Sequence, residues 1–367
     1  MTVNKQVLIA TLLLLSGWTI AVPSVQAVQA PSVDLAQANP ENQRLRDLLR
    51  RGRELVDAGQ LAEAIPVYEE AATIESDNAR IYSALGFLQA RQNNYQAAVE
   101  AYQRAIALDN DNGDFYYALG FSQANLQDYS SAAASYRRAT ELDQDNVEAF
   151  IGLGVVLARQ GDFNGAIDAY RRVTALQPNS AQAYKFIGSA YIQQERYSEA
   201  VESLRRAAEL APREADVQIN LGVALINLGN TPDGLTALER AASLEPRNAQ
   251  THLQIGEIFQ AQGNLDQALT FYRRAASANP GLADVHVLMG NVLLEQEDYL
   301  LAIVQYREAI ELQPNEPQTH YQLGLALQGR DRIAEAIASF EQARTLYEQQ
   351  NNAEGVAKVE EALDQMN

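Results

Sequence analysis

The chain has 367 residues, of which 47% are hydrophobic, a formal net charge of −19 and no cysteine. The apolar share is sufficient for a folded core. The absence of cysteine excludes disulfides and a lipid attached at a cysteine, and the strong negative charge argues against nucleic acid as a partner.

The first 27 residues have the features of a secretory signal peptide. Lys5 is their only charged residue, an apolar run covers residues 7–22, and Val25-Gln26-Ala27 is a candidate cleavage site. The run is shorter than the ~20 residues that a spanning helix needs, and Pro23 closes it. We therefore expect cleavage after Ala27 and export to the periplasm or an equivalent lumenal compartment. The alternative is an uncleaved segment that anchors the protein in the membrane.

Residues 28–44 are interpreted as a linker and the start of the first helix. The linker holds Pro, Ser, Gln and Ala without a sustained hydrophobic period. Asn39-Pro40 has the pattern of a helix N-cap followed by proline at the first helical position. An apolar stripe of Leu45, Leu48 and Leu49 follows, so the first helix is expected to begin there.

Residues 181–214 contain two stripes at helical spacing, separated by a polar turn. The first stripe holds Tyr184, Ile187, Gly188 and Tyr191, and the second holds Ala200, Leu204 and Ala207. Pro212 then ends the second helix. This pattern predicts a hairpin of two amphipathic helices, with small residues where the helices meet.

The same pattern recurs every 34 residues between residues 45 and 350, which gives nine units. The glycine recurs as Gly52, Gly86, Gly120, Gly154, Gly188, Gly222, Gly256, Gly290 and Gly324. The first small residue of the second helix is alanine in every unit except the sixth, which has Gly234. Residues 351–367 form one more amphipathic stripe, as expected of a capping helix.

These residues resemble the tetratricopeptide repeat, whose pattern is W-x2-L-G-x2-Y, then A-x3-F, then A and P. The resemblance covers residues 45–350 and implies an all-α fold, a right-handed superhelical solenoid of helix–turn–helix repeats. A single hairpin cannot bury its own apolar face, so the units are expected to stack into one continuous core.

Neither the arginines nor the histidines predict a ligand site. Arg137-Arg138 and Arg205-Arg206 are followed by Glu141 and Glu209, which are expected to neutralise part of their charge. The histidines occupy a position that holds an aromatic ring in earlier units, and the ~10 Å between stacked helices is too long for them to share one metal ion. They are His252, His286 and His320. We expect no metal, no cofactor and no catalytic site.

The first helices are unusually apolar, and the family resemblance implies that their fifth, ninth and twelfth positions line a concave groove. The residues expected to bind a partner there are Tyr117, Phe121, Ile151, Val155, Lys185, Ser189, Ile192, Ile219, Val223 and Ile226. Contiguous apolar surface generally marks an interaction site. An alternative is that these residues pack against neighbouring repeats and leave only a shallow groove.

The sequence thus predicts a non-catalytic scaffold of the cell envelope that binds a protein or peptide segment. Because the protein is strongly acidic, the segment is expected to be apolar at its centre and neutral or basic at its flanks. Residues 28–38 could occupy the groove in the resting state. The alternatives are a membrane-tethered assembly factor and an accessory arm of an envelope transferase or polysaccharide-secretion complex.

Overall fold

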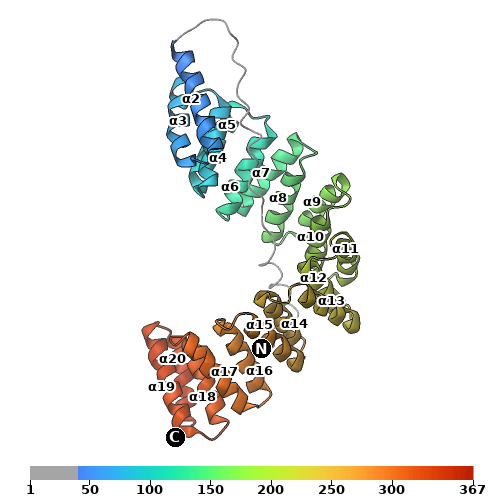
Figure 1. The fold of residues 1–367 in the computed structure, drawn as a ribbon, viewed down its shortest axis with the longest axis vertical. Helices are drawn as coiled ribbons and strands as arrows, with labels where there is room; N and C mark the ends of the chain where they lie inside the picture. Colours follow the sequence, from blue (N-terminus) through green and yellow to red (C-terminus); the bar gives the residue numbers. More distant parts are fainter. Residues whose placement is uncertain (1–39, 367) are drawn as a thin grey trace. The chain divides into compact units, whose positions relative to one another are not determined.

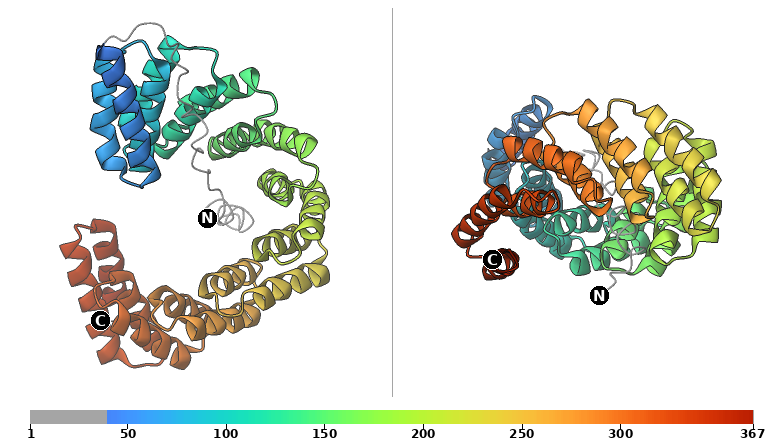
Figure 2. Two further views of the ribbon diagram at one scale, coloured as in Figure 1. Left: turned by 45° about the horizontal axis from the view of Figure 1, so that its top comes forward. Right: turned by 90° about the horizontal axis from the view of Figure 1, so that it is seen from below.

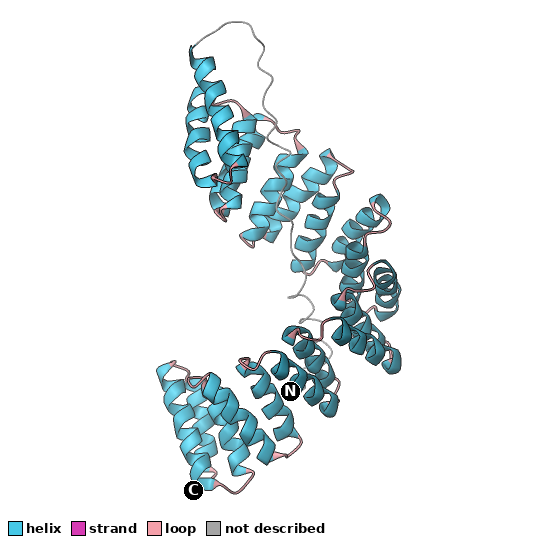
Figure 3. Ribbon diagram, in the orientation of Figure 1, coloured by secondary structure: helices cyan, strands magenta, loops and turns pink. Residues whose placement is uncertain are grey.

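The computed structural model describes residues 40–366, and every regular element among them is an α-helix joined to the next by a short turn (Figure 3). The predicted all-α fold of successive helical hairpins is confirmed. The predicted signal peptide and most of the predicted linker lie outside the described residues. The chain divides after Pro212 into two compact units, which are described separately.

The described part of the first unit, residues 40–212, consists of five hairpins (Figure 1). Its helices are α2 (Pro40–Asp57), α3 (Leu61–Ile74), α4 (Ala79–Arg91), α5 (Tyr95–Leu108), α6 (Gly113–Asn125), α7 (Tyr129–Leu142), α8 (Val147–Arg159), α9 (Phe163–Leu176), α10 (Ala181–Gln193) and α11 (Tyr197–Leu210). The even-numbered helix of each pair is the first helix of its repeat. The first helix begins at Pro40, as the sequence predicts.

The second unit, residues 213–366, holds four hairpins and one further helix; Figure 2 shows its hairpins following one another in chain order. Its helices are α12 (Ala215–Asn227), α13 (Thr231–Leu244), α14 (Ala249–Ala261), α15 (Leu265–Ala278), α16 (Ala283–Glu295), α17 (Tyr299–Leu312), α18 (Pro317–Gln328), α19 (Ile333–Gln349) and α20 (Ala353–Asp364). α20 packs against α19 and buries Val359 completely.

Polar side chains cap the N-termini of many of the helices, including both helices of the fourth repeat. Asn146 accepts a hydrogen bond from the backbone nitrogen of Ala149 at 2.9 Å, which caps α8. Asp162 accepts one from the nitrogen of Gly165 at 2.9 Å, which caps α9. Each bond satisfies a backbone donor that has no partner inside the helix. These caps therefore set where both helices of the repeat begin.

The recurring glycine lets a large side chain of the second helix lie against the first. A Cβ atom added at Gly188 would lie 2.5 Å from Cγ of Leu204, and one at Gly290 would lie 2.6 Å from Cε1 of Tyr306. Leu204 and Tyr306 are both fully buried. Real Cβ atoms do not approach other carbon atoms so closely, so only glycine allows this helix spacing.

Each hairpin turn contains one residue with left-handed backbone, and these residues are also 34 positions apart. They are Gly59, Asn93, Gln127, Gly161, Glu195, Gly229, Gly263, Glu297 and Asp331, with φ between 58° and 92°. Glycine adopts this conformation readily, whereas most other residues do so at a cost. The backbone conformation of the turn is therefore the same in every repeat, although the residue at this position varies.

Candidate functional site

Seven of the residues expected to bind a partner lie on the first helices of three consecutive repeats in the first unit. Tyr117 and Phe121 are on α6, and Ile151 and Val155 are on α8. The other three, Lys185, Ser189 and Ile192, are on α10. They share a face because they occupy the fifth, ninth or twelfth position of their helices, and these positions lie on one side of a helix. The three remaining residues, Ile219, Val223 and Ile226, are on α12 in the second unit.

The structure buries eight of these ten side chains, whereas the resemblance predicts a groove of exposed apolar surface and packing against neighbouring repeats is the alternative. Phe121 is 3% exposed, Val155 2% and Val223 1%, and only Ile151 and Lys185 are partly exposed. The reason is that these positions also pack between neighbouring helices. The rings of Phe121 and Tyr95, which is on α5, lie edge to face with 6.2 Å between their centroids. Partner binding by this face stays a prediction. Among the apolar side chains of the ten residues, Ile151 is the one that is partly exposed.

Two carboxylates lie near the apolar side chains in the first unit. Burial, followed by the charges of Glu148 and Asp114, raises the pKa of Tyr117 to about 12. Both carboxylates are exposed and lie in the first turn of their helices, α8 and α6. Sequence reasoning missed them, although an acidic residue at the second position of both helices is a visible signal. They form an acidic edge beside Tyr117.

Two polar residues, Lys185 and Ser189, interrupt the predicted apolar face on α10 and are joined within one turn of that helix. Ser189 Oγ donates to the carbonyl oxygen of Lys185 at 3.0 Å, and Ser189 is only 6% exposed. The Lys185 ammonium lies 5.8 Å from the centre of the Phe186 ring. Lys185 is partly exposed, and it is the cationic residue among the ten predicted ones.

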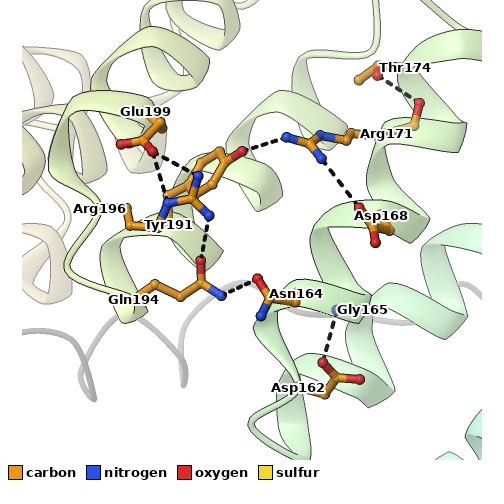
Figure 4. A network of polar contacts seen from close by, with 10 residues as sticks. All are labelled: Asp162, Asn164, Gly165, Asp168, Arg171, Thr174, Tyr191, Gln194, Arg196 and Glu199. Atoms are coloured by element: carbon orange, nitrogen blue, oxygen red, sulfur yellow. Dashed lines mark hydrogen bonds and ion pairs between the residues drawn. The ribbon is translucent and has the colours of Figure 1, made fainter.

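A polar network joins the fourth and fifth repeats next to this face (Figure 4). Arg171 Nη2 on α9 donates to Tyr191 Oη on α10 at 2.8 Å. The Arg196 guanidinium stacks over the same ring at 4.5 Å and donates to Glu199 at 2.9 Å. Gln194 Nε2 donates to Asn164 Oδ1 at 2.9 Å, a second link between the two repeats. These bonds fix α10 against α9 and so orient the face that carries Lys185 and Ile192.

The arginine pairs and the histidines are placed largely as the sequence predicts. Arg138 and Arg206 form ion pairs with Glu141 at 3.2 Å and with Glu209 at 3.0 Å. His252 is 3% exposed and packs 6.2 Å from the ring of Phe271. Among residues 40–366, no group of three or more His, Cys, Asp or Glu side chains is arranged to hold a metal ion.

Comparison with known families identifies tetratricopeptide repeats along the chain. A family model described as the C-terminal domain of cilia and flagella-associated protein 70 matches residues 107–322. Models of single tetratricopeptide repeats match residues 52–93, 79–112 and 317–350. No curated protein matches the chain.

Solved structures of tetratricopeptide repeat proteins are similar to this one. A tetratricopeptide repeat protein from Parabacteroides merdae is 17% identical, with 68% of this chain and 99% of that chain covered and a TM-score of 0.53. MamA from Desulfovibrio magneticus is 22% identical over 46% of this chain and 94% of its own, with a TM-score of 0.44. The Cut9–Hcn1 hetero-tetramer of the APC/C is 20% identical over 76% of this chain and 55% of that chain, with a TM-score of 0.46.

The family model over residues 107–322 spans more than half of the chain and covers hairpins of both units. The fold of the Parabacteroides merdae protein agrees with this assignment. The chain belongs to the tetratricopeptide-repeat family, and residues 107–322 belong to the family described as the C-terminal domain of cilia and flagella-associated protein 70.

Proposed function

We propose that the protein is a non-catalytic scaffold whose first unit binds a peptide segment along α6, α8 and α10. The tetratricopeptide-repeat fold supports binding of protein partners in general. The observation that carries the specific proposal is the pair of apolar positions shared by α6 and α8, which α10 continues with Lys185, Ser189 and Ile192. Ile151 is accessible among the apolar side chains. Equivalent positions on successive helices repeat at a constant spacing, which suits an extended or helical segment.

The charges near this face favour one kind of partner. Glu148 and Asp114 are exposed beside Tyr117, and the chain as a whole carries a charge of −19. A segment with basic flanks would be attracted to this edge, while an acidic segment would be repelled. The apolar centre of the segment would contact Ile151 and the edges of the buried Tyr117 and Phe121 rings. We therefore infer a partner with an apolar centre and neutral or basic flanks.

The cellular place of this activity is also a proposal. The signal-peptide features of residues 1–27 support export to the periplasm or an equivalent compartment, and an uncleaved segment would instead tether the protein to a membrane. None of the helices between residues 40 and 366 has the length and apolarity to span a membrane. A role as an accessory arm of an envelope transferase or secretion complex would require co-purification with a catalytic chain.

Synthetic peptides test the binding face directly. Three peptides with the same apolar centre and basic, neutral or acidic flanks would be titrated by fluorescence anisotropy. We expect affinity to fall in that order. Ile151→Asp should weaken binding by about tenfold or more, because it places an unpaired charge against the apolar segment. Serine at Phe121 or Val223 is less informative, since both side chains are buried and the loss would reflect folding.

The acidic edge has its own variant and a matched control. Asp114→Asn with Glu148→Gln should slow association of the basic peptide and reduce its dependence on salt. Glu100→Gln with Glu202→Gln removes the same charge from exposed positions on α5 and α11, and should change neither quantity. Equal binding of all three peptides, or unchanged affinity of Ile151→Asp, would move the binding site away from this face.

The protein's own residues 28–38 are a possible competitor, and they lie outside the described residues. Their deletion from the mature chain should raise the affinity for the basic peptide if they occupy the face at rest. An unchanged affinity would exclude this form of autoinhibition.

A further inference from the structure

A cavity of about 550 Å³ opens at the surface of the second unit, where α13, α14 and α15 meet. Its polar lining consists of Ser243, Arg247, His252, Arg273, Arg274 and Ser277. The remaining lining is apolar, from alanine and proline side chains. This volume is in the range of pockets that hold small organic ligands, and the polar lining offers hydrogen-bond donors and positive charge but no carboxylate.

His252 supplies a buried polar atom without a partner. The side chain lines the cavity and is 3% exposed. Its Nε2 atom lies 3.1 Å from the carbonyl oxygen of Pro246, so Nε2 carries a proton and donates to that oxygen. Nδ1 has no hydrogen-bond partner among the described residues. A buried ring nitrogen left unpaired is costly. Nδ1 is itself closed off from solvent, so a ligand in the cavity would pair with it only after a small shift of the side chains that cover it.

The arginines of the cavity are only partly neutralised. Arg274 donates to Glu239 at 3.1 Å and stacks over the Phe271 ring at 4.5 Å, so its position is fixed. Neither Arg247 nor Arg273 forms an ion pair with a carboxylate of residues 40–366. The nearby Glu245 is instead hydrogen-bonded by Asn248 at 2.8 Å and by Thr251.

The histidine hydrogen bond recurs in the ninth repeat, where His320 Nε2 lies 2.9 Å from the carbonyl oxygen of Pro314. Glu341 and Gln342 stand there in place of Arg273 and Arg274, so the combination of histidine and arginines distinguishes the seventh repeat from the ninth.

Tyr82 and Phe150 occupy the place of His252 in the second and fourth repeats, and an arginine stacks over each ring at 5.6 Å. Tyr82 Oη donates to the carbonyl oxygen of Ser76, as His252 does to that of Pro246. Tyrosine therefore reproduces this hydrogen bond but not the free nitrogen.

We propose that this cavity is a binding site for the anionic group of a small organic ligand, either a phosphate monoester or a carboxylate. Arg247 and Arg273 would each present a planar fork of donors to the oxygen atoms. After a small shift of the covering side chains, His252 Nδ1 would accept a hydrogen bond from a protonated oxygen of the ligand. The serine hydroxyls and the apolar lining would contact the rest of the ligand. This site is separate from the proposed peptide-binding face, because all its residues lie in the second unit.

Calorimetric titration of the mature full-length chain with phenyl phosphate, inorganic phosphate and benzoate tests the site. We expect saturable binding at millimolar concentration or tighter, with phenyl phosphate or benzoate bound better than inorganic phosphate because the ring contacts the apolar lining. A preference for phenyl phosphate identifies a phosphate monoester, and a preference for benzoate identifies a carboxylate. Absence of saturable binding by all three compounds would overturn the proposal.

Arg247→Gln with Arg273→Gln should weaken binding by about tenfold or more, because two charge-assisted contacts are lost. Both side chains are exposed, so the unfolding temperature should not change. Arg205→Gln with Arg213→Gln is the matched control: it removes the same charge from exposed positions that do not line the cavity, and it should leave binding intact. Equal weakening by both double variants would show a general effect of charge and overturn the site.

His252→Tyr separates binding from packing. It retains a ring and a donor to the carbonyl of residue 246, as Tyr82 shows at the equivalent place, but it removes Nδ1. We expect weaker ligand binding with no loss of thermal stability. Unchanged binding in this variant would exclude His252 from the site and leave the buried nitrogen unexplained, which would count against the proposal.

Discussion

Gly188→Leu tests the packing on which every repeat depends. The added Cβ would lie 2.5 Å from Cγ of Leu204, which is fully buried and cannot move into solvent. Overpacking typically costs up to about 3 kcal/mol, and leucine regains about 1 kcal/mol of helix propensity relative to glycine. The net loss of stability should therefore be about 2 kcal/mol, or about 4–8 °C in the unfolding temperature of a unit of this size.

A double-mutant cycle shows whether the loss comes from this contact. Leu204→Ala alone should cost about 2–5 kcal/mol by leaving a cavity. The double variant places the larger side chain on the opposite helix, so its cost should be smaller than the sum by about 1 kcal/mol or more. Urea unfolding followed by circular dichroism measures all four proteins.

The control for this cycle is Gly281→Leu. Its Cβ would meet only Oδ1 of Asn279, at 3.5 Å, so stability should change by no more than about 0.5 kcal/mol. An unchanged unfolding midpoint for Gly188→Leu, or strict additivity in the cycle, would show that the helices do not depend on this contact.

Three further predictions concern processing, local stability and pH. The protein isolated from its host should begin at Val28, which intact-mass measurement checks; an intact Met1 in the membrane fraction would support the tethered alternative. Amide exchange should be faster across residues 220–238 than in the repeats on either side, because Gln218 replaces an aromatic ring and Gly234 replaces alanine; equal protection would contradict this. Burial raises the pKa of Tyr117 to about 12, and that of Tyr102 well above its ordinary value. The unfolded chain loses these protons first, so stability should be fully present below a pH of about 10 and should fall as pH rises above it. Urea midpoints that do not fall in alkaline buffer would refute this assignment, and Tyr117→Phe should reduce the fall.

The sequence predicts the hairpins well because their signals are local and recur. The small residue at Gly188, the large one at Leu204 and the proline at Pro212 each have a role within a single repeat. Pro40 likewise marks the start of α2. Such features depend only on neighbours in the chain, and the 34-residue period confirms each of them several times over.

The binding face was harder to predict because burial depends on how closely successive repeats approach. The repeat register identifies the positions of Phe121 and Val223, but not that they would be 3% and 1% exposed. In the sixth repeat, a Cβ at Gly234 would lie 2.9 Å from the carbonyl oxygen of Gly222. This glycine therefore permits a close approach of α12 and α13, whereas composition alone suggests only a weaker helix.

The cavity beside His252 could not be predicted because it combines residues from three helices. The sequence shows the histidine and the Arg273-Arg274 pair as separate recurring features, each with an ordinary explanation. Only the structure places them around the same volume, together with Arg247 from the turn before α14.

The left-handed residues of the hairpin turns have a consequence for engineering this array. Four of the nine are glycines with no atom within 4 Å of an added Cβ, so backbone strain alone, and no packing contact, opposes another side chain there. Gln127, Glu195 and Glu297 adopt the same backbone, and each gives up about 1 kcal/mol that glycine would retain. The turns are thus interchangeable connectors: three point substitutions to glycine would make the array more heat-resistant without altering either proposed binding surface.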